Sequence, residues 1–139
     1  MPQIEDKLKQ IGYELPPPPP PGGNYVPAVR TGNLVFLAGV VSKRADGSTI
    51  VGKLGRDLTI DEGYEAARLC ALNLLSNLKK ELGDLDKIKR IVKLLAMVNS
   101  DPEFPSPPAV ANGCSDPVSY THLRAHETDS YLVCRLLLE

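Results

Sequence analysis

Six consecutive prolines at residues 16–21, followed by two glycines, constrain this chain more than any other feature. Proline fixes its own φ angle, donates no backbone hydrogen bond and keeps the residue before it extended. The run therefore cannot lie inside a helix or a sheet, and we expect an extended, polyproline-like spacer. We interpret it as a stiff strap between an N-terminal helix and the first strand. A ligand for an SH3-type domain is the alternative, but no basic residue flanks the run to orient such a ligand.

The segment before the prolines predicts one short amphipathic helix. Ile4, Leu8 and Ile11 repeat at helical spacing over residues 3–11, and Gly12 can end the helix. A helix of this length is unstable alone, so we expect it to dock on the rest of the chain. Residues 1–23 are therefore assigned to an N-terminal helix and proline strap.

The sequence after the strap predicts strands. Residues 24–30 can start a strand that Pro27 restricts to an edge or a bulge. Residues 34–41 are apolar throughout, and we expect a buried central strand there. Gly39 inside this run suggests a bulge or a close backbone approach. A short strand at 49–51 follows.

Residues 59–82 predict the longest helix of the chain. Thr59 and Glu62 have the spacing of a capping box, and apolar side chains then recur every three or four residues. Gly83 directly after this segment fits a C-terminal cap. A helix of this length can cover one face of a sheet.

The sequence up to residue 116 predicts one more strand and a second helix. Residues 87–99 have the composition of a long strand with its first half partly exposed. Its basic residues could form an RNA-binding patch, but no aromatic residues interleave with them, so we favour a solvated edge. Pro107 can begin a helix, which we expect to end near residue 116 because Pro117 follows.

Charge and composition exclude several function classes. The chain has 139 residues and a net charge of −1, which removes the electrostatic case for general nucleic-acid binding. No apolar run approaches the ~18–20 residues of a membrane span, and no signal peptide is recognisable, so we expect a cytoplasmic protein. Three cysteines without a CxxC pair, and two histidines, give no zinc pattern. We expect no metal, and thiols that are buried or free.

Several segments, taken in order, resemble one known family. Residue 23 opens the stretch Gly-Asn-Tyr-Val-Pro-Ala-Val-Arg-Thr-Gly-Asn, which leads to Leu-Ala-Gly at 37–39, and residue 62 opens Glu-Gly-Tyr-Glu-Ala-Ala-Arg. The other matching parts are Asn73 and residues 83–85, 92–94, 98–104 and 112–116. Together they resemble the RidA/YjgF family, in the branch labelled endoribonuclease or chorismate-mutase-like. The resemblance covers about residues 4–116.

The resemblance implies an α+β fold of the chorismate-mutase-like type, with two helices on one face of a mainly antiparallel sheet. Family members are usually homotrimers with a cleft between neighbouring subunits. Enzymes of the RidA branch hydrolyse imines or enamines to 2-oxo acids and ammonia without metal or cofactor. The implied partners are thus a small imino or oxo acid and further copies of the chain, with no membrane or nucleic acid. A non-catalytic trimer that binds a small carboxylate and an endoribonuclease are the alternatives.

The resemblance also indicates substrate-binding positions. Tyr25 matches the family's site tyrosine, and Gly39 matches a glycine whose backbone can approach a ligand because it has no Cβ. Ala38 stands where typical deaminases have a serine, so one hydroxyl hydrogen bond is missing. The family also needs an arginine that clamps the substrate carboxylate and a glutamate that positions water. Both should follow Asp116, and we assign no catalytic residue in this chain.

The family resemblance stops after Asp116. Residues 117–139 contain no glycine and resemble a segment that recurs at the ends of unrelated predicted proteins. We interpret 117–139 as a non-family tail of artefactual origin, and 24–116 as an incomplete RidA-like domain that lacks its last two strands. Such a loss exposes a sheet edge and an apolar face, so we expect poor solubility or a failure to trimerise.

Two patterns in this tail resemble functional groups. Arg124 with Glu127, or the Arg–Glu pair at 135 and 139, could be taken for the missing arginine and glutamate, but their spacing does not suit two separate strands. His122 and His126 are four residues apart, as in half of a metal site, but no third ligand accompanies them. A helix or a disordered tail is the simpler interpretation.

Overall fold

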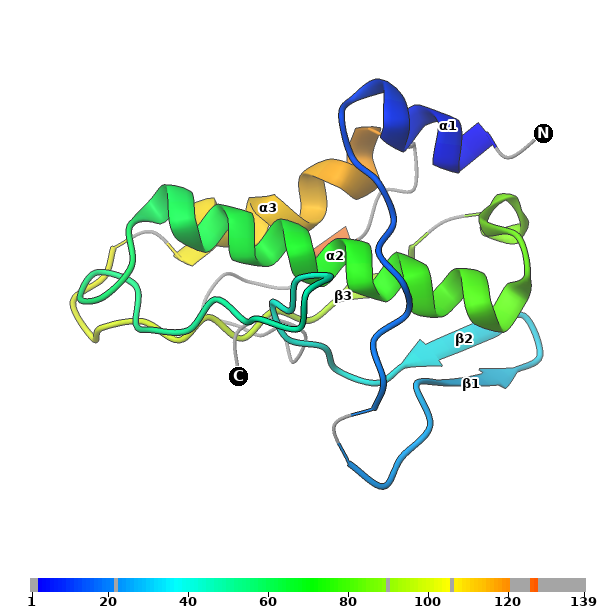
Figure 1. Ribbon diagram of the computed structural model, residues 1–139, viewed down its shortest axis with the longest axis horizontal. Coiled ribbons are helices and arrows are strands. Elements are labelled where there is room, and N and C mark those ends of the chain that lie inside the picture. Colours follow the sequence, from blue (N-terminus) through cyan, green and yellow to red (C-terminus); the bar gives the residue numbers. More distant parts are fainter. Residues whose placement is uncertain (1–2, 22, 90, 106, 121–125, 128–139) are drawn as a thin grey trace.

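The computed structural model describes residues 3–21, 23–89, 91–105, 107–120 and 126–127. Along the chain it forms α1 (Gln3–Gln10), β1 (Ala28–Thr31), β2 (Leu34–Leu37), α2 (Ile60–Leu82), the 3-10 helix η1 (Leu85–Lys87), β3 (Lys93–Leu94), α3 (Pro107–Tyr120) and β4 (His126–Glu127). Helix α2 lies at the centre, with α3 alongside it and the β1–β2 hairpin beneath its C-terminal half (Figure 1). The result is an α+β arrangement built around one long helix.

Helix α2 begins and ends where its local sequence predicts. The Glu62 backbone N–H donates to the Thr59 hydroxyl at 3.2 Å, and the Thr59 N–H donates to the Glu62 carboxylate at 3.1 Å. This reciprocal pair satisfies two backbone donors that the first turn would otherwise leave unpaired. At the other end Gly83 has a φ of 82° and donates its N–H to the Lys79 carbonyl at 2.7 Å. The predicted capping box and glycine cap are both confirmed.

Helices α2 and α3 pack closely because glycine stands at their contact. A Cβ placed on Gly113 would lie 2.1 Å from the Tyr64 carbonyl oxygen and 2.9 Å from the Ala67 Cβ. Around this contact lies a core of buried side chains: Leu54, Ala66, Ala67, Cys70, Ala71, Val110 and Cys114. Helix α3 continues through Pro117 to Tyr120, so the prediction that it ends near residue 116 is wrong. A proline in this last turn removes one helical hydrogen bond and does not stop the chain from following helical dihedrals.

Helix α1 docks as expected, although with a shorter apolar stripe. Ile4 and Leu8 are buried against residues of α2 and η1. The Asp86 carboxylate accepts hydrogen bonds from the Gln3 N–H at 2.7 Å and the Ile4 N–H at 2.9 Å, and so caps the start of α1. Ile11 is 38 % exposed because the helix ends at Gln10 and Ile11 lies in the turn that follows.

The predicted central strand is shorter and less buried than its apolar sequence suggests. β1 and β2 pair antiparallel, with Ala28 opposite Leu37. On one face Val35 and Leu37 pack against the core beneath α2, whereas on the other face Leu34 and Phe36 are 48 % and 61 % exposed. The expectation of a fully buried strand is wrong for this chain, because α2 covers only one face of the hairpin.

The two other predicted strands also differ from expectation. Residues 49–51 make a single bridge, between Thr49 and Lys43. Among the described residues of 87–99, only β3 is a strand, and it pairs in parallel with β4 for two residues. A strand extends only as far as a partner pairs with it, so apolar composition alone overestimates its length. The strand at 126–127 also shows that a helical tail is wrong at that point.

No helix in the part of the chain that the structure describes is both long enough and apolar enough to cross a membrane. Cys70 and Cys114 are both buried, as predicted, and form no disulfide bond, whereas Cys134 lies outside the described residues.

Candidate functional site

The three predicted substrate-binding residues lie at the open end of the β1–β2 hairpin. The Ala38 N–H donates to the Pro27 carbonyl at 2.9 Å, which extends the strand pairing one step beyond Ala28 and Leu37. Tyr25 is two residues before Pro27, and Gly39 directly follows Ala38. The hairpin register therefore joins the segment of Tyr25 to that of Ala38 and Gly39 through the Pro27–Ala38 pair.

These residues are accessible to a ligand. Tyr25 is 48 % exposed, Gly39 is exposed and Ala38 is half-buried. The Tyr25 N–H donates to the Gly23 carbonyl at 3.0 Å, and a Cβ on Gly23 would lie 3.4 Å from the Tyr25 ring. The ring thus lies over the turn that precedes it. A phenol, a methyl group and a bare backbone can bind a small ligand, but they provide no carboxylate or cation for catalysis.

Asn73 holds the chain that leaves this end of the hairpin. Its side-chain amide is 2 % exposed and donates to the Lys43 carbonyl at 3.0 Å and the Val41 carbonyl at 3.3 Å. These bonds join α2 to the segment that begins two residues after Gly39. Asn73 is part of the family resemblance in the sequence, which assigns no role to it. A polar residue within the apolar repeat of a helix is the sequence signal that could have revealed one.

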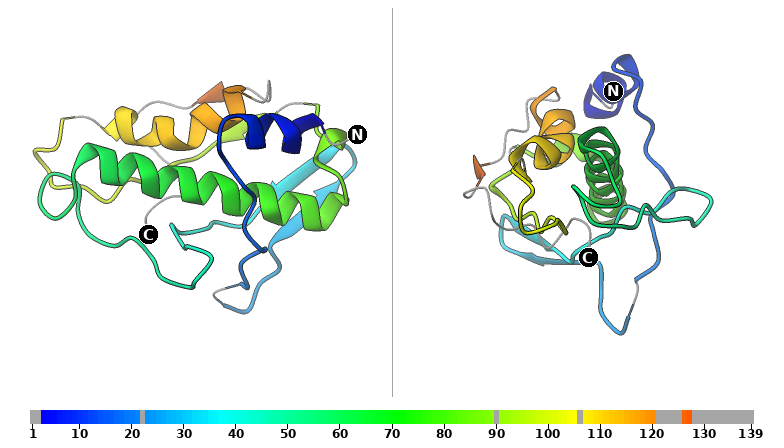
Figure 2. Two further views of the ribbon diagram at one scale, coloured as in Figure 1. Left: turned by 45° about the horizontal axis from the view of Figure 1, so that its top comes forward. Right: turned by 90° about the vertical axis from the view of Figure 1, so that its left-hand side faces the viewer.

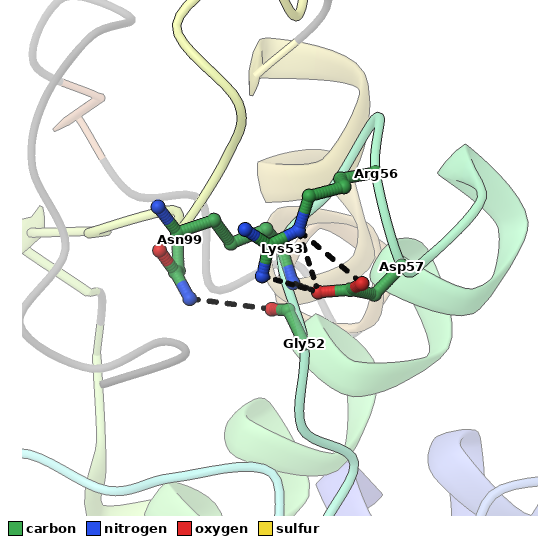
Figure 3. Close-up of polar contacts among 5 residues, drawn as sticks. All are labelled: Gly52, Lys53, Arg56, Asp57 and Asn99. Carbon is green, nitrogen blue, oxygen red and sulfur yellow. Dashed lines mark hydrogen bonds and ion pairs between the residues drawn. The ribbon is translucent and has the colours of Figure 1, made fainter.

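The loop before α2 is held by polar contacts that Figure 3 shows. The Asp57 carboxylate accepts from the Lys53 N–H at 3.0 Å and from the Arg56 guanidinium at 2.9 Å. The hydrogen bond from Arg56 is the main reason why the pKa of Asp57 is lowered. Asn99 donates to the Gly52 carbonyl at 3.3 Å. These exposed contacts join neighbouring parts of the loop, so we assign them a structural role.

A second polar group joins α2 to the segment after α1. Arg68 donates to the Glu65 carboxylate through two nitrogens, and its guanidinium lies 4.9 Å from the centre of the Tyr13 ring. The hydrogen bond from Arg68 lowers the pKa of Glu65, and in return raises the pKa of Arg68. Both groups therefore remain charged at neutral pH, and their pairing with each other argues against a catalytic role.

One cavity lies away from the predicted site. It measures about 250 Å³ and lies between α1, the start of the strap and α2. Its lining residues are Glu5, Leu8, Lys9, Tyr13, Glu14, Leu15 and Lys79. The Lys79 ammonium and the Glu5 carboxylate, 2.9 Å apart, pair across this wall. No local sequence pattern predicts this cavity, because Lys79 lies more than 60 residues from the other lining residues.

The described residues do not include a group that could hold a metal ion. No cluster of three or more His, Cys, Asp or Glu side chains occurs among them. The tail residues Arg124, His122 and the pair at 135 and 139 lie outside the described residues. The family's arginine and glutamate were expected after Asp116. Of that segment the structure describes only 117–120, at the end of α3, and 126–127, in β4.

The fold places the chain among small α+β domains of the chorismate-mutase-like type. A crystal structure described as a putative endoribonuclease from Shewanella oneidensis matches with a TM-score of 0.85 and 29 % identity, covering 94 % of this chain and 93 % of that one. Protein Atu1372 of unknown function, from Agrobacterium tumefaciens, matches with a TM-score of 0.78 and 34 % identity, covering 90 % and 79 %. These structures confirm the predicted fold class, and the short sheet is consistent with the expected missing strands.

The chain belongs to the family described as YjgF/chorismate mutase-like, putative endoribonuclease, whose sequence model matches residues 5–133. Protein TCP17 from Trypanosoma cruzi is 42 % identical over 114 residues, which cover 82 % of this chain and 71 % of TCP17. The family resemblance found in the sequence is therefore confirmed. The matched range continues past Asp116, so the domain boundaries and the artefactual origin of 117–139 remain predictions.

Proposed function

We propose that this chain binds a small imino or oxo acid at the open end of the β1–β2 hairpin, as a RidA-like imine/enamine deaminase with impaired activity. One observation supports this most directly. The Ala38 N–H donates to the Pro27 carbonyl, so the exposed residues Tyr25 and Gly39 belong to the two chain segments that leave the open end of the hairpin. Membership of the family and the match of these two positions to its site add support. The compartment we expect for this activity is the cytoplasm.

The reaction needs more groups than the hairpin supplies. Water adds to the C=N carbon of a 2-imino acid, the C–N bond then breaks, and a 2-oxo acid and ammonia leave. Tyr25 would line the cleft, and the Gly39 backbone would lie against the ligand. The carboxylate clamp and the water-positioning carboxylate are the arginine and glutamate expected after Asp116. Without them, and with Ala38 in place of serine, we expect slow turnover.

We also propose that the chain forms a homotrimer, with the cleft between two subunits, only when a family-type C-terminal segment completes its fold. Val29, Leu34 and Phe36 are apolar and between 48 % and 61 % exposed on the outer face of the hairpin. A second copy that covered this face would stabilise the assembly by about 25 cal/mol for each Å² of apolar surface that it buries. Size-exclusion chromatography tests the assembly. A stable trimer would contradict our expectation that this chain fails to trimerise.

The decisive assay is hydrolysis of 2-iminobutyrate, coupled to detection of the 2-oxo acid. It should compare this chain with a version that carries a family-type C-terminal segment after Asp116. We expect the completed version to be active and the present chain to be much slower. Tyr25→Phe should lower the rate of the completed version, whereas Tyr13→Phe, which also removes one phenol hydroxyl, should not. A completed version no faster than the uncatalysed reaction would refute the deaminase proposal.

Ala38 favours a second candidate, a non-catalytic protein that binds a small carboxylate. The methyl group of Ala38 keeps the shape of the site and lacks the hydroxyl of the usual serine. A ligand that binds only the folded chain raises its melting temperature by mass action. A thermal shift with 2-oxobutyrate and no turnover by the completed version would support this candidate. RNA cleavage, which the name of the Shewanella relative suggests, is disfavoured by the net charge of −1.

A further inference from the structure

The residue types and trans peptide bonds of the strap indicate a polyproline II helix. Residues 16–21 belong to no helix or strand, and no cis peptide bond occurs among the described residues. Consecutive trans prolines have one accessible conformation, a left-handed helix with three residues per turn and a rise of about 3.1 Å per residue. The six prolines therefore form about two turns with a length of about 19 Å.

The burial of the prolines repeats with the same period of three. Pro16 and Pro19 are half-buried, whereas Pro17, Pro18, Pro20 and Pro21 are exposed. A polyproline II helix has three edges, and one edge here faces the protein body along its whole length. The Ser76 hydroxyl of α2 donates to the Pro16 carbonyl at 2.6 Å and fixes this inward edge. Figures 1 and 2 show this segment crossing the outside of α2.

The two outward edges have the form that aromatic grooves recognise. Such grooves bind two pairs of neighbouring residues, one turn apart, and leave the residue between them pointing away. Pro17–Pro18 and Pro20–Pro21 are two such pairs, and Pro19 between them already faces the protein body. A groove could therefore bind both pairs without displacing the strap from α2.

We propose that this outward proline surface, formed by Pro17, Pro18, Pro20 and Pro21, binds the aromatic groove of a domain that recognises uncharged proline runs. The flanking sequence determines the class of domain. Glu14 and Leu15 precede the run and two glycines follow it, so no adjoining residue of the run is a cation for an acidic specificity pocket. The attachment to α2 holds the surface in its bound conformation, which lowers the ordering cost of association. This role is separate from the proposed imine site, and the strap serves both as connector and as ligand.

Profilin, whose tryptophan-containing groove binds homopolymeric proline, is a suitable probe. This chain contains no tryptophan, so a change in tryptophan fluorescence reports the groove alone. The full chain titrated into profilin should give a saturable fluorescence change, and a synthetic hexaproline peptide should compete with it. No saturable change up to millimolar chain concentration would overturn the proposal.

Two matched double variants test which edges bind. Pro17→Ala with Pro20→Ala removes an outward edge, and Pro16→Ala with Pro19→Ala removes the inward edge. Both lose two prolines, so the loss of stiffness is equal. We expect the outward variant to bind profilin at least tenfold more weakly with an unchanged melting temperature. The inward variant should melt earlier and lose less than threefold in affinity. An equal loss of affinity in both variants would overturn the proposed orientation of the strap.

Discussion

Replacing Gly113 by alanine should destabilise the fold, although alanine is the better helix former. Helix propensity alone predicts a gain of about 1 kcal/mol, because glycine loses more backbone entropy. The structure predicts the opposite sign. The new Cβ would lie 2.1 Å from the Tyr64 carbonyl oxygen, and backbone atoms of α2 cannot rotate away as a side chain can. The helices must separate by about 1 Å to restore ordinary contact.

Overpacking of this kind costs about 1–3 kcal/mol, and a backbone clash belongs at the upper end. After subtraction of the propensity gain, we expect a net loss of about 2 kcal/mol. For a domain of this size the melting temperature should then fall by roughly 7 °C. Urea denaturation followed by far-ultraviolet circular dichroism measures the loss. The control is Asn112→Ala at an exposed position one residue earlier, which should be neutral or stabilising. A Gly113→Ala variant as stable as the parent would refute this account of the α2–α3 contact.

Four further measurements test other parts of the structure. Hydrogen bonds from the N–H groups of Ile4 and Gln3 lower the pKa of Asp86, so its stabilising contribution should be complete at neutral pH. The free energy of unfolding of the parent should exceed that of Asp86→Asn at neutral pH, and the difference should shrink as the pH falls below 3.8 through the lowered pKa. Asn73→Ala leaves two carbonyls without their donor and should lower the free energy of unfolding by about 1–3 kcal/mol in urea titrations. Burial, with a smaller effect of the second thiol, raises the pKa of Cys70, so a thiol reagent should label it in urea and scarcely at all in the native state. Phe36→Ser should change stability by no more than about 0.5 kcal/mol in the monomer, and any loss of self-association in sedimentation runs would assign the outer hairpin face to an interface.

Local signals in the sequence predict the helices of this chain well. The capping box of α2 joins residues three positions apart, and the glycine cap acts within one turn. The proline strap is equally local, because proline restricts its own backbone whatever surrounds it. Such features depend little on the rest of the fold, so the sequence specifies them directly. Pro117 is the exception, since a single missing hydrogen bond did not end α3 there.

Strands are less predictable because their extent depends on distant partners. The apolar run at 34–41 gives a four-residue strand, and 87–99 gives a two-residue one. Each ends where pairing with another segment ends, and no local residue encodes that point. The same limit applies to the cavity beside α1, whose lining comes from segments more than 60 residues apart. The Asp86 cap on α1 likewise joins residues that are 82 and 83 positions apart.

The candidate site is intermediate between these cases. Tyr25, Ala38 and Gly39 could be identified from the family resemblance, but how their segments meet depends on the hairpin register and on the Ala38–Pro27 hydrogen bond. Both faces of β2 carry apolar side chains, which is typical of a strand that is buried on two sides. Helix α2 covers only one of these faces. The second side begins beside the same open end of the hairpin. A partner that covered both Leu34 and Phe36 would therefore extend from the turn of the hairpin towards its open end.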